Sequence, residues 1–150
     1  MIRLLKSRPQ LMASFDSCDL PSRKALGCEI WNRPLKWMER ATAIITGIII
    51  IEDCGTERVV YSGPVEFDGE SEMGGPVRRI NVPPSDTGVS IGIVVIFPSA
   101  GSVHLYGQTQ QILPGKYNVV IQVEENGRTW PFSKGLHVTA ESPFAVWVES

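Results

Sequence analysis

Residues 114–139 constrain the fold of this chain more than any other segment. Their sequence is PGKYNVVIQVEENGRTWPFSKGLHVT, in which Asn126-Gly127 separates two runs suited to β-strands. Asn-Gly is a strong signal for a two-residue hairpin, because both residues tolerate the positive φ that the turn needs. Every second side chain of the first run is apolar, which predicts an inner face of Tyr117, Val119, Ile121 and Val123. The return strand is expected to break at Pro131, since proline has no N–H for the ladder.

Other segments rich in β-branched residues are also expected to be strands. They are residues 42–53, 57–62, 64–67, 77–82, 89–97, 102–107 and 144–148. The 14 Gly and 11 Pro residues separate apolar runs, and no alternation of strands with helices is evident. Short strands joined by hairpin turns predict an all-β fold, an antiparallel immunoglobulin-like β-sandwich.

The first 40 residues differ from the rest in charge and in pattern. They carry eight Lys or Arg and four acidic residues, a net charge of +4, whereas residues 41–150 have a net charge of −6. Pro9, Pro21 and Pro34 interrupt this segment, and no period is sustained. The sequence therefore predicts an irregular basic N-terminal arm over residues 1–40 and a β-sandwich domain over residues 41–150.

The arm supplies the candidate interface residues, which are Trp31, Arg33, Lys36 and Trp37. Tryptophan and arginine dominate the energy of many interfaces, and opposite charge would draw the arm of one copy to the body of the next. We therefore expect a homo-oligomer. The alternative is a tail that packs on its own domain.

The segment GVSIG, residues 88–92, matches the Gly-x-Ser-x-Gly pattern of many hydrolases. In those enzymes the serine lies on a sharp turn between a strand and a following helix. Here a turn precedes the pattern and strand-forming residues 93–97 follow it. Glu124 and His137, the possible triad partners, lie within one hairpin with no obvious route to Ser90. We expect no catalytic residue and no enzymatic activity, with a serine hydrolase that uses Ser90 as a remote alternative.

No metal site or cofactor is expected. His104 and His137 are isolated histidines without a second ligand at the spacing of a zinc site. An acidic loop could offer oxygens to calcium, but its spacing is not that of a calcium-binding loop. Its members are Glu66, Asp68, Glu70 and Glu72.

Neither nucleic acid nor a membrane is an expected partner. Arg78-Arg79 is accompanied by no nucleic-acid-binding motif, and the apolar run at 43–51 is too short for a membrane-spanning helix. Cys18, Cys28 and Cys54 form no Cys-x-x-Cys pair, and the first residues do not read as an export signal. These features predict reduced thiols and synthesis in a cytoplasm.

The C-terminal half resembles the small β-sandwich domains of tailed-phage virion proteins, especially baseplate and tail-fibre components. In those domains a turn ending in Gly leads to a Gly-x-Tyr strand, a polar hairpin with Gly, and a strand of the form Gly-apolar-x-Val. The resemblance covers about residues 80–142. The matching residues are Leu113, Pro114, Gly115, Tyr117, Gly127, Gly135, Leu136, Val138 and Thr139.

This resemblance implies a non-enzymatic structural protein of a bacteriophage virion, in the tail, the baseplate or a fibre anchor. Its partners would be other virion proteins and copies of itself, and it would be assembled in the host cytoplasm. A bacterial immunoglobulin-like adhesion or carbohydrate-binding module is the alternative.

Overall fold

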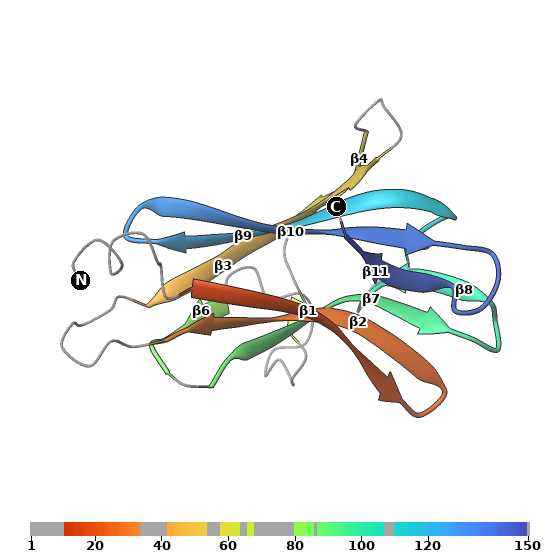
Figure 1. The fold of residues 1–150 in the computed structure, drawn as a ribbon, viewed down its shortest axis with the longest axis horizontal. Coiled ribbons are helices and arrows are strands. Elements are labelled where there is room, and N and C mark those ends of the chain that lie inside the picture. Colours follow the sequence, from red (N-terminus) through yellow and green to blue (C-terminus); the bar gives the residue numbers. More distant parts are fainter. Residues whose placement is uncertain are drawn as a thin grey trace.

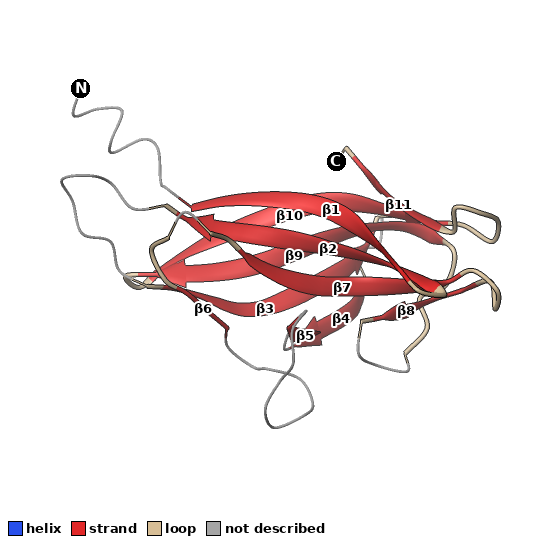
Figure 2. Ribbon diagram, turned by 90° about the horizontal axis from the view of Figure 1, so that it is seen from below, coloured by secondary structure: helices blue, strands red, loops and turns tan. Residues whose placement is uncertain are grey.

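The computed structural model describes residues 11–33, 42–53, 58–63, 66–67, 80–85, 87–106 and 110–149. Within these ranges all regular structure is β-strand (Figure 2), and every strand pairing is antiparallel. The strands are β1 (Leu11–Leu20), β2 (Arg23–Asn32), β3 (Ala43–Glu52), β4 (Val59–Gly63), β5 (Glu66–Phe67), β6 (Ile80–Val82), β7 (Val89–Phe97), β8 (Ser102–Leu105), β9 (Gly115–Glu125), β10 (Arg128–Val138) and β11 (Ala145–Val148).

The strands form two sheets that pack as the layers of a sandwich (Figure 1). One sheet has the order β1-β2-β7-β5, with β8 also on β7, and the other has the order β11-β10-β9-β3-β4, with β6 also on β3. An immunoglobulin-type sandwich places strands A, B, E and D in one sheet and C′, C, F and G in the other. With β1, β2, β7 and β5 as A, B, E and D, and β4, β3, β9 and β10 as C′, C, F and G, these eight strands match both orders, and β6, β8 and β11 are additional. The prediction of an all-β, antiparallel immunoglobulin-like sandwich is therefore confirmed.

The prediction of an irregular arm is wrong for residues 11–32. These residues form the hairpin β1–β2, whose register runs without a break from Leu11–Asn32 to Leu20–Arg23. Strand β2 in turn pairs with β7, and its side chains Leu26, Cys28 and Ile30 lie in the common core. The hairpin is thus the first part of the sandwich. The predicted domain boundary falls within residues 34–41, outside the described residues.

Two local features hid this hairpin from sequence analysis. The buried positions of β2 include the polar Asn32 and the adjacent pair Ala25 and Leu26, so its apolar alternation is short. Pro21 lies in the two-residue turn between β1 and β2, where Ser22 has a φ of 64°. A proline within such a turn joins two strands and does not end the β-structure.

The hairpin β9–β10 confirms the predicted register. Glu125 pairs with Arg128 across Asn126 and Gly127, whose φ angles are 52° and 76°. All four predicted inner residues of β9 are buried, with exposed fractions of 5% or less. The expected break at Pro131 is wrong, because β10 runs unbroken from Arg128 to Val138. Pairing of β10 with β11 begins only at Gly135, so the missing N–H of Pro131 meets no strand on that side.

The core lies between the two sheets. Strand β3 contributes Ala43, Ile45, Ile48 and Ile50, β7 contributes Ile91, Ile93, Val94 and Ile96, and β9 contributes its four inner residues. Strand β3 lies between β9 on one side and β4 and β6 on the other, so it is a central strand of its sheet.

Two hydrogen bonds join the sheets at their margins. The buried Asn32 side chain donates to the carbonyl oxygen of Val82 at 3.0 Å and so links β2 to β6. The indole N–H of Trp147 on β11 donates to the carbonyl oxygen of Asp16 on β1 at 2.8 Å. Phe15 packs edge-on against the same indole, with ring centroids 5.0 Å apart. These contacts hold β1 against the opposite sheet.

We expect Ile121→Ala to lower the free energy of unfolding by about 2–5 kcal/mol, because it leaves a cavity at a fully buried position. The half-buried Gln122 points to the other side of β9, so Gln122→Ala should change stability little. Urea titration followed by tryptophan fluorescence measures both. Equal losses at the two positions would contradict the observed register.

Deletion of residues 1–33 should prevent folding, because β7 would lose the strand β2 and the core would lose its side chains. Deletion of residues 1–10 leaves every described strand intact and is the matched control. Circular dichroism during heating distinguishes the two truncations. A cooperative melt of the shorter chain, residues 34–150, would show that β1–β2 is dispensable.

Candidate functional site

The residues of GVSIG lie at the start of β7, and each glycine has a structural reason. A Cβ on Gly92 would lie 2.5 Å from the ring of Tyr106, and one on Gly88 would lie 2.6 Å from the carboxylate of Glu29. Ser90 is exposed, lies opposite Glu29 in the register of β2 with β7, and is followed by seven more residues of β7. Ser90 therefore lies within a strand, whereas the catalytic serine of such a hydrolase lies on a turn between a strand and a helix.

The histidines lie far from Ser90 along the strands. His104 on β8 lies opposite Val95, five residues or about 17 Å along β7 from Ser90. Its Nε2 lies 3.0 Å from the Ser102 hydroxyl, and its ring packs against Phe97. His137 lies opposite Lys116 on β9, in the other sheet.

The possible acid and base of a triad are also apart. Glu124 lies opposite Thr129, eight residues from the level of His137, which is about 27 Å along the strands. The structure thus does not bring together the three residues that the hydrolase alternative would need. Within the described ranges, no group of three or more His, Cys, Asp or Glu side chains could hold a metal ion.

The predicted interface residues are only partly described. Trp31 is half-buried on β2 opposite Met12, and Arg33 is exposed just after β2 ends. Lys36 and Trp37 lie outside the described residues. The same holds for Arg78-Arg79 and for the acidic loop, except for Glu66, whose backbone begins β5.

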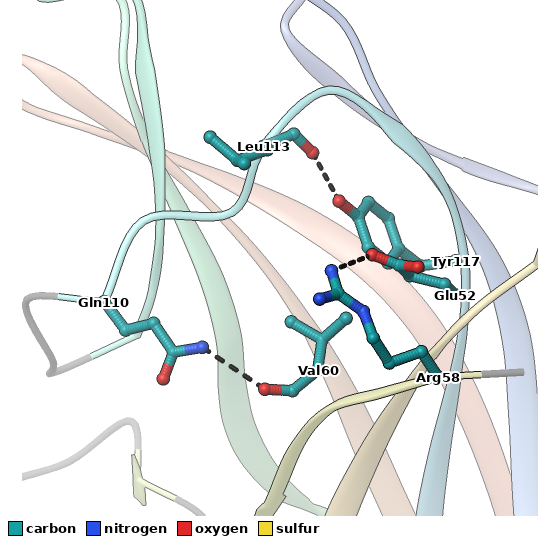
Figure 3. Close-up of polar contacts among 6 residues, drawn as sticks. All are labelled: Glu52, Arg58, Val60, Gln110, Leu113 and Tyr117. Carbon is teal, nitrogen blue, oxygen red and sulfur yellow. Dashed lines mark hydrogen bonds and ion pairs between the residues drawn. The ribbon is translucent and has the colours of Figure 1, made fainter.

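A recess of about 270 Å³ lies beside Tyr117 at the start of β9. Figure 3 draws six of its lining residues. The recess is formed by the end of β3, the start of β4 and the segment between β8 and β9. Its lining residues are Glu52, Arg58, Val59, Val60, Gln110, Gln111, Leu113 and Tyr117. Sequence analysis missed this recess, because its walls come from segments about 50 residues apart in the chain.

Hydrogen bonds fix the walls of the recess. The hydroxyl of the buried Tyr117 donates to the carbonyl oxygen of Leu113 at 2.5 Å, four residues upstream. Such a bond at the start of strand F is the tyrosine corner of immunoglobulin-like sandwiches. The side-chain amide of Gln110 donates to the carbonyl oxygen of Val60 at 3.3 Å and ties this segment to β4 (Figure 3).

The rim of the recess combines a charged pair with exposed apolar side chains. Arg58 forms an ion pair with Glu52, and their side chains are 71% and 22% exposed. Val59 is 54% exposed and Leu113 is 64% exposed. The arrangement offers an apolar contact area next to amide and charged groups, which is suited to binding. Among the lining residues that the structure describes, no nucleophile is paired with a base.

A second candidate surface is the outer face of the six-stranded sheet, the side turned away from the other sheet. The outward side chains of β3 include Ile44, Ile49 and Ile51, and β9 adds Val120. All four are half-buried within this chain. Residues 42–53 are apolar on both faces, but a two-layer sandwich covers only one of them.

The outer face is hollowed at one end, where a depression of about 380 Å³ lies over Gly135. Its other lining residues are Asp53, Lys116, Tyr117, Asn118, Leu136, His137, Val148 and Glu149. A Cβ on Gly135 would lie 2.8 Å from the Val148 side chain, so only glycine fits there. At the margin, the Lys134 ammonium donates to the Glu149 carboxylate at 2.7 Å and lowers the pKa of that carboxyl.

The two described cysteines differ in environment. Cys18 is exposed, whereas Cys28 is 1% exposed on β2. Burial in the core, with the nearby charge of Asp16, raises the pKa of the Cys28 thiol from 9.0 to about 12. Cys28 therefore stays a neutral thiol at physiological pH and acts as a small apolar core residue.

We expect Gly92→Ala to destabilise the fold by about 1–3 kcal/mol, because the new Cβ would overlap the Tyr106 ring. Ser90→Ala, two residues away, should leave the melting temperature unchanged. Differential scanning fluorimetry measures both variants. That Ser90 is not a nucleophile stays a prediction, which covalent labelling by a fluorophosphonate would contradict.

Iodoacetamide at pH 8 should modify Cys18 within minutes and leave Cys28 unmodified until the protein is unfolded, as followed by peptide mass spectrometry. Burial raises the pKa of the Cys28 thiol in the folded state, so this thiol should not change the free energy of unfolding below about pH 9. It should reduce stability as the pH rises from about 9 towards 12, where the unfolded thiol ionises first. Rapid labelling of Cys28 in the folded protein would show that β1–β2 opens readily.

Among the residues that the structure describes, no helix is long and apolar enough to cross a membrane.

Comparisons with known proteins assign this chain to no family. No family model, no curated protein sequence and no solved structure matches the chain.

Proposed function

We propose that the chain is a non-enzymatic structural protein of a bacteriophage virion, present in several copies as a tail, baseplate or fibre-anchoring component. The observation that carries this proposal is the apolar outer face of the six-stranded sheet. Ile44, Ile49, Ile51 and Val120 point away from a core that is already complete between the sheets. Apolar surface of this kind marks sites where other proteins bind.

The resemblance to virion β-sandwich domains supports the proposal through residues of β9 and β10. Gly115 and Tyr117 begin β9, and Tyr117 forms the tyrosine corner with Leu113. Gly127 has a φ of 76° in the hairpin turn, and Gly135 gives space to Val148. Each of these residues shapes the sandwich or its surface, as expected for a protein that acts through its place in an assembly.

The N-terminal segment is the second proposed contact region. Trp31 and Arg33 lie at the end of β2, and Lys36 and Trp37 follow them in the sequence. Basic residues there could meet the acidic body of a neighbouring protein. Because residues 11–32 belong to the sandwich, this contact would extend the body instead of forming a separate arm.

An adhesion or carbohydrate-binding module is the second candidate function. The recess beside Tyr117 favours it, because Gln110 and Gln111 place amide groups next to the exposed Val59 and Leu113. Sugars are bound by polar side chains that flank an apolar surface, and a pocket needs few such groups.

Purified particles test the proposal directly. Phage from a culture that expresses this gene would be banded in a caesium chloride gradient and analysed by quantitative mass spectrometry and cryo-electron microscopy. The protein should be present in several copies per particle, at symmetry-related positions. Its absence from particles, together with binding to a glycan array that Gln110→Ala abolishes, would favour the carbohydrate-binding module instead.

A further inference from the structure

We infer that the outer face of the six-stranded sheet binds the same face of a second copy of this chain, about a two-fold axis that passes beside Val120. The inference rests on the proposed role in assembly and names the surface, the partner and the symmetry. In this pairing the axis is parallel to the sheets and perpendicular to the strands. The two β9 strands therefore face each other and run in opposite directions.

The outward side chains of β9 are self-complementary in this arrangement. In chain order they are Lys116, Asn118, Val120, Gln122 and Glu124, since they alternate with the four buried residues. Reversal about Val120 places Lys116 of each copy opposite Glu124 of the other. It also places Asn118 opposite Gln122, so that two amides can exchange hydrogen bonds, and brings the two Val120 side chains together.

The flanking strands are complementary in shape at the same levels. On β3, Gly47 lies level with Gln122 and Ile51 lies level with Asn118, so the pairing sets Ile51 of one copy over Gly47 of the other. On β10, Pro131 lies level with Gln122 and Gly135 lies level with Asn118. The exposed Pro131 would then enter the depression over Gly135 of the facing copy.

The face approaches the size that a specific dimer needs. Strands β3, β9 and β10 cover the nine residue levels from Lys116 to Glu124, and β4 and β11 each pair over a shorter stretch at the sides. With strands about 4.8 Å apart, this face covers on the order of 500 Å² in each copy. Two such faces bury about 1,000 Å² together, which is roughly the lower limit for a specific interface. Outward isoleucines of β3 would form the apolar centre, and the charged residues would lie at the rim.

The first test is the oligomeric state of the full-length chain, measured by sedimentation velocity over a range of concentrations. The parent protein should reach a dimer. Val120→Asp sets two carboxylates against each other at the axis and should leave a monomer with an unchanged melting temperature. Met12→Asp, at a 47% exposed position on the other sheet, is the matched control and should still dimerise.

A charge exchange tests the orientation. Lys116→Glu and Glu124→Lys should each weaken the homodimer by at least about tenfold at low salt, because each places like charges opposite each other. Mixing the two variants should restore a dimer of one copy of each, and the double variant should dimerise as the parent does. Arg23→Glu, on the other sheet, has the same charge change as Lys116→Glu and should leave the dimer intact.

Three results would overturn the inference. They are a parent chain that stays monomeric at millimolar concentration, a dimer that survives Val120→Asp, and single charge variants that mixing does not rescue. These results are distinguishable from failure of the proposed function. A chain that is monomeric yet present in virions would contradict only the pairing, whereas a dimer absent from virions would contradict only the virion role.

Discussion

The register of β9 is the constraint on which the rest of the structure depends. Its inner residues Tyr117, Val119, Ile121 and Val123 are buried to 95% or more, and β9 lies between β3 and β10 near the middle of its sheet. A shift by one residue would turn every side chain of the strand to the opposite face. It would expose the core and bury Lys116, Gln122 and Glu124. The burial that fixes the inner face therefore also fixes the order of charges and amides on the outer face.

The sandwich was predictable where the sequence pattern is local. The hairpin at Asn126-Gly127 was predicted because the turn and both strands lie within one short segment, and the tyrosine corner falls at its start. Hairpin β1–β2 was not, because β2 completes its sheet with β7, which lies about 60–70 residues further along the chain. A pattern read along one strand cannot show which distant strand completes its sheet.

The surface was less predictable than the fold, for the same reason. GVSIG resembles a catalytic motif in sequence, but Gly88 and Gly92 approach Glu29 on β2 and Tyr106 just after β8, which lie elsewhere in the chain. The recess at Tyr117 needs Val60 and Gln110, which are 50 residues apart. By contrast, the outward pattern of β9 could be read directly from the sequence.

The outer edges of both sheets bear on how copies of this chain could associate. An unpaired edge strand invites another chain to extend the sheet. Here Trp147 donates to the Asp16 carbonyl on β1, and Gln110 donates to the Val60 carbonyl on β4. Side chains from the opposite sheet and from the β8–β9 segment thus engage a backbone acceptor on each of these two strands, and this disfavours the pairing of another chain along β1 and β4. The outward isoleucines of β3 with Val120 remain as the surface on which the proposed pairing rests. Face-to-face pairing about a two-fold axis closes on itself, so it gives a defined dimer that a larger assembly can use as a unit.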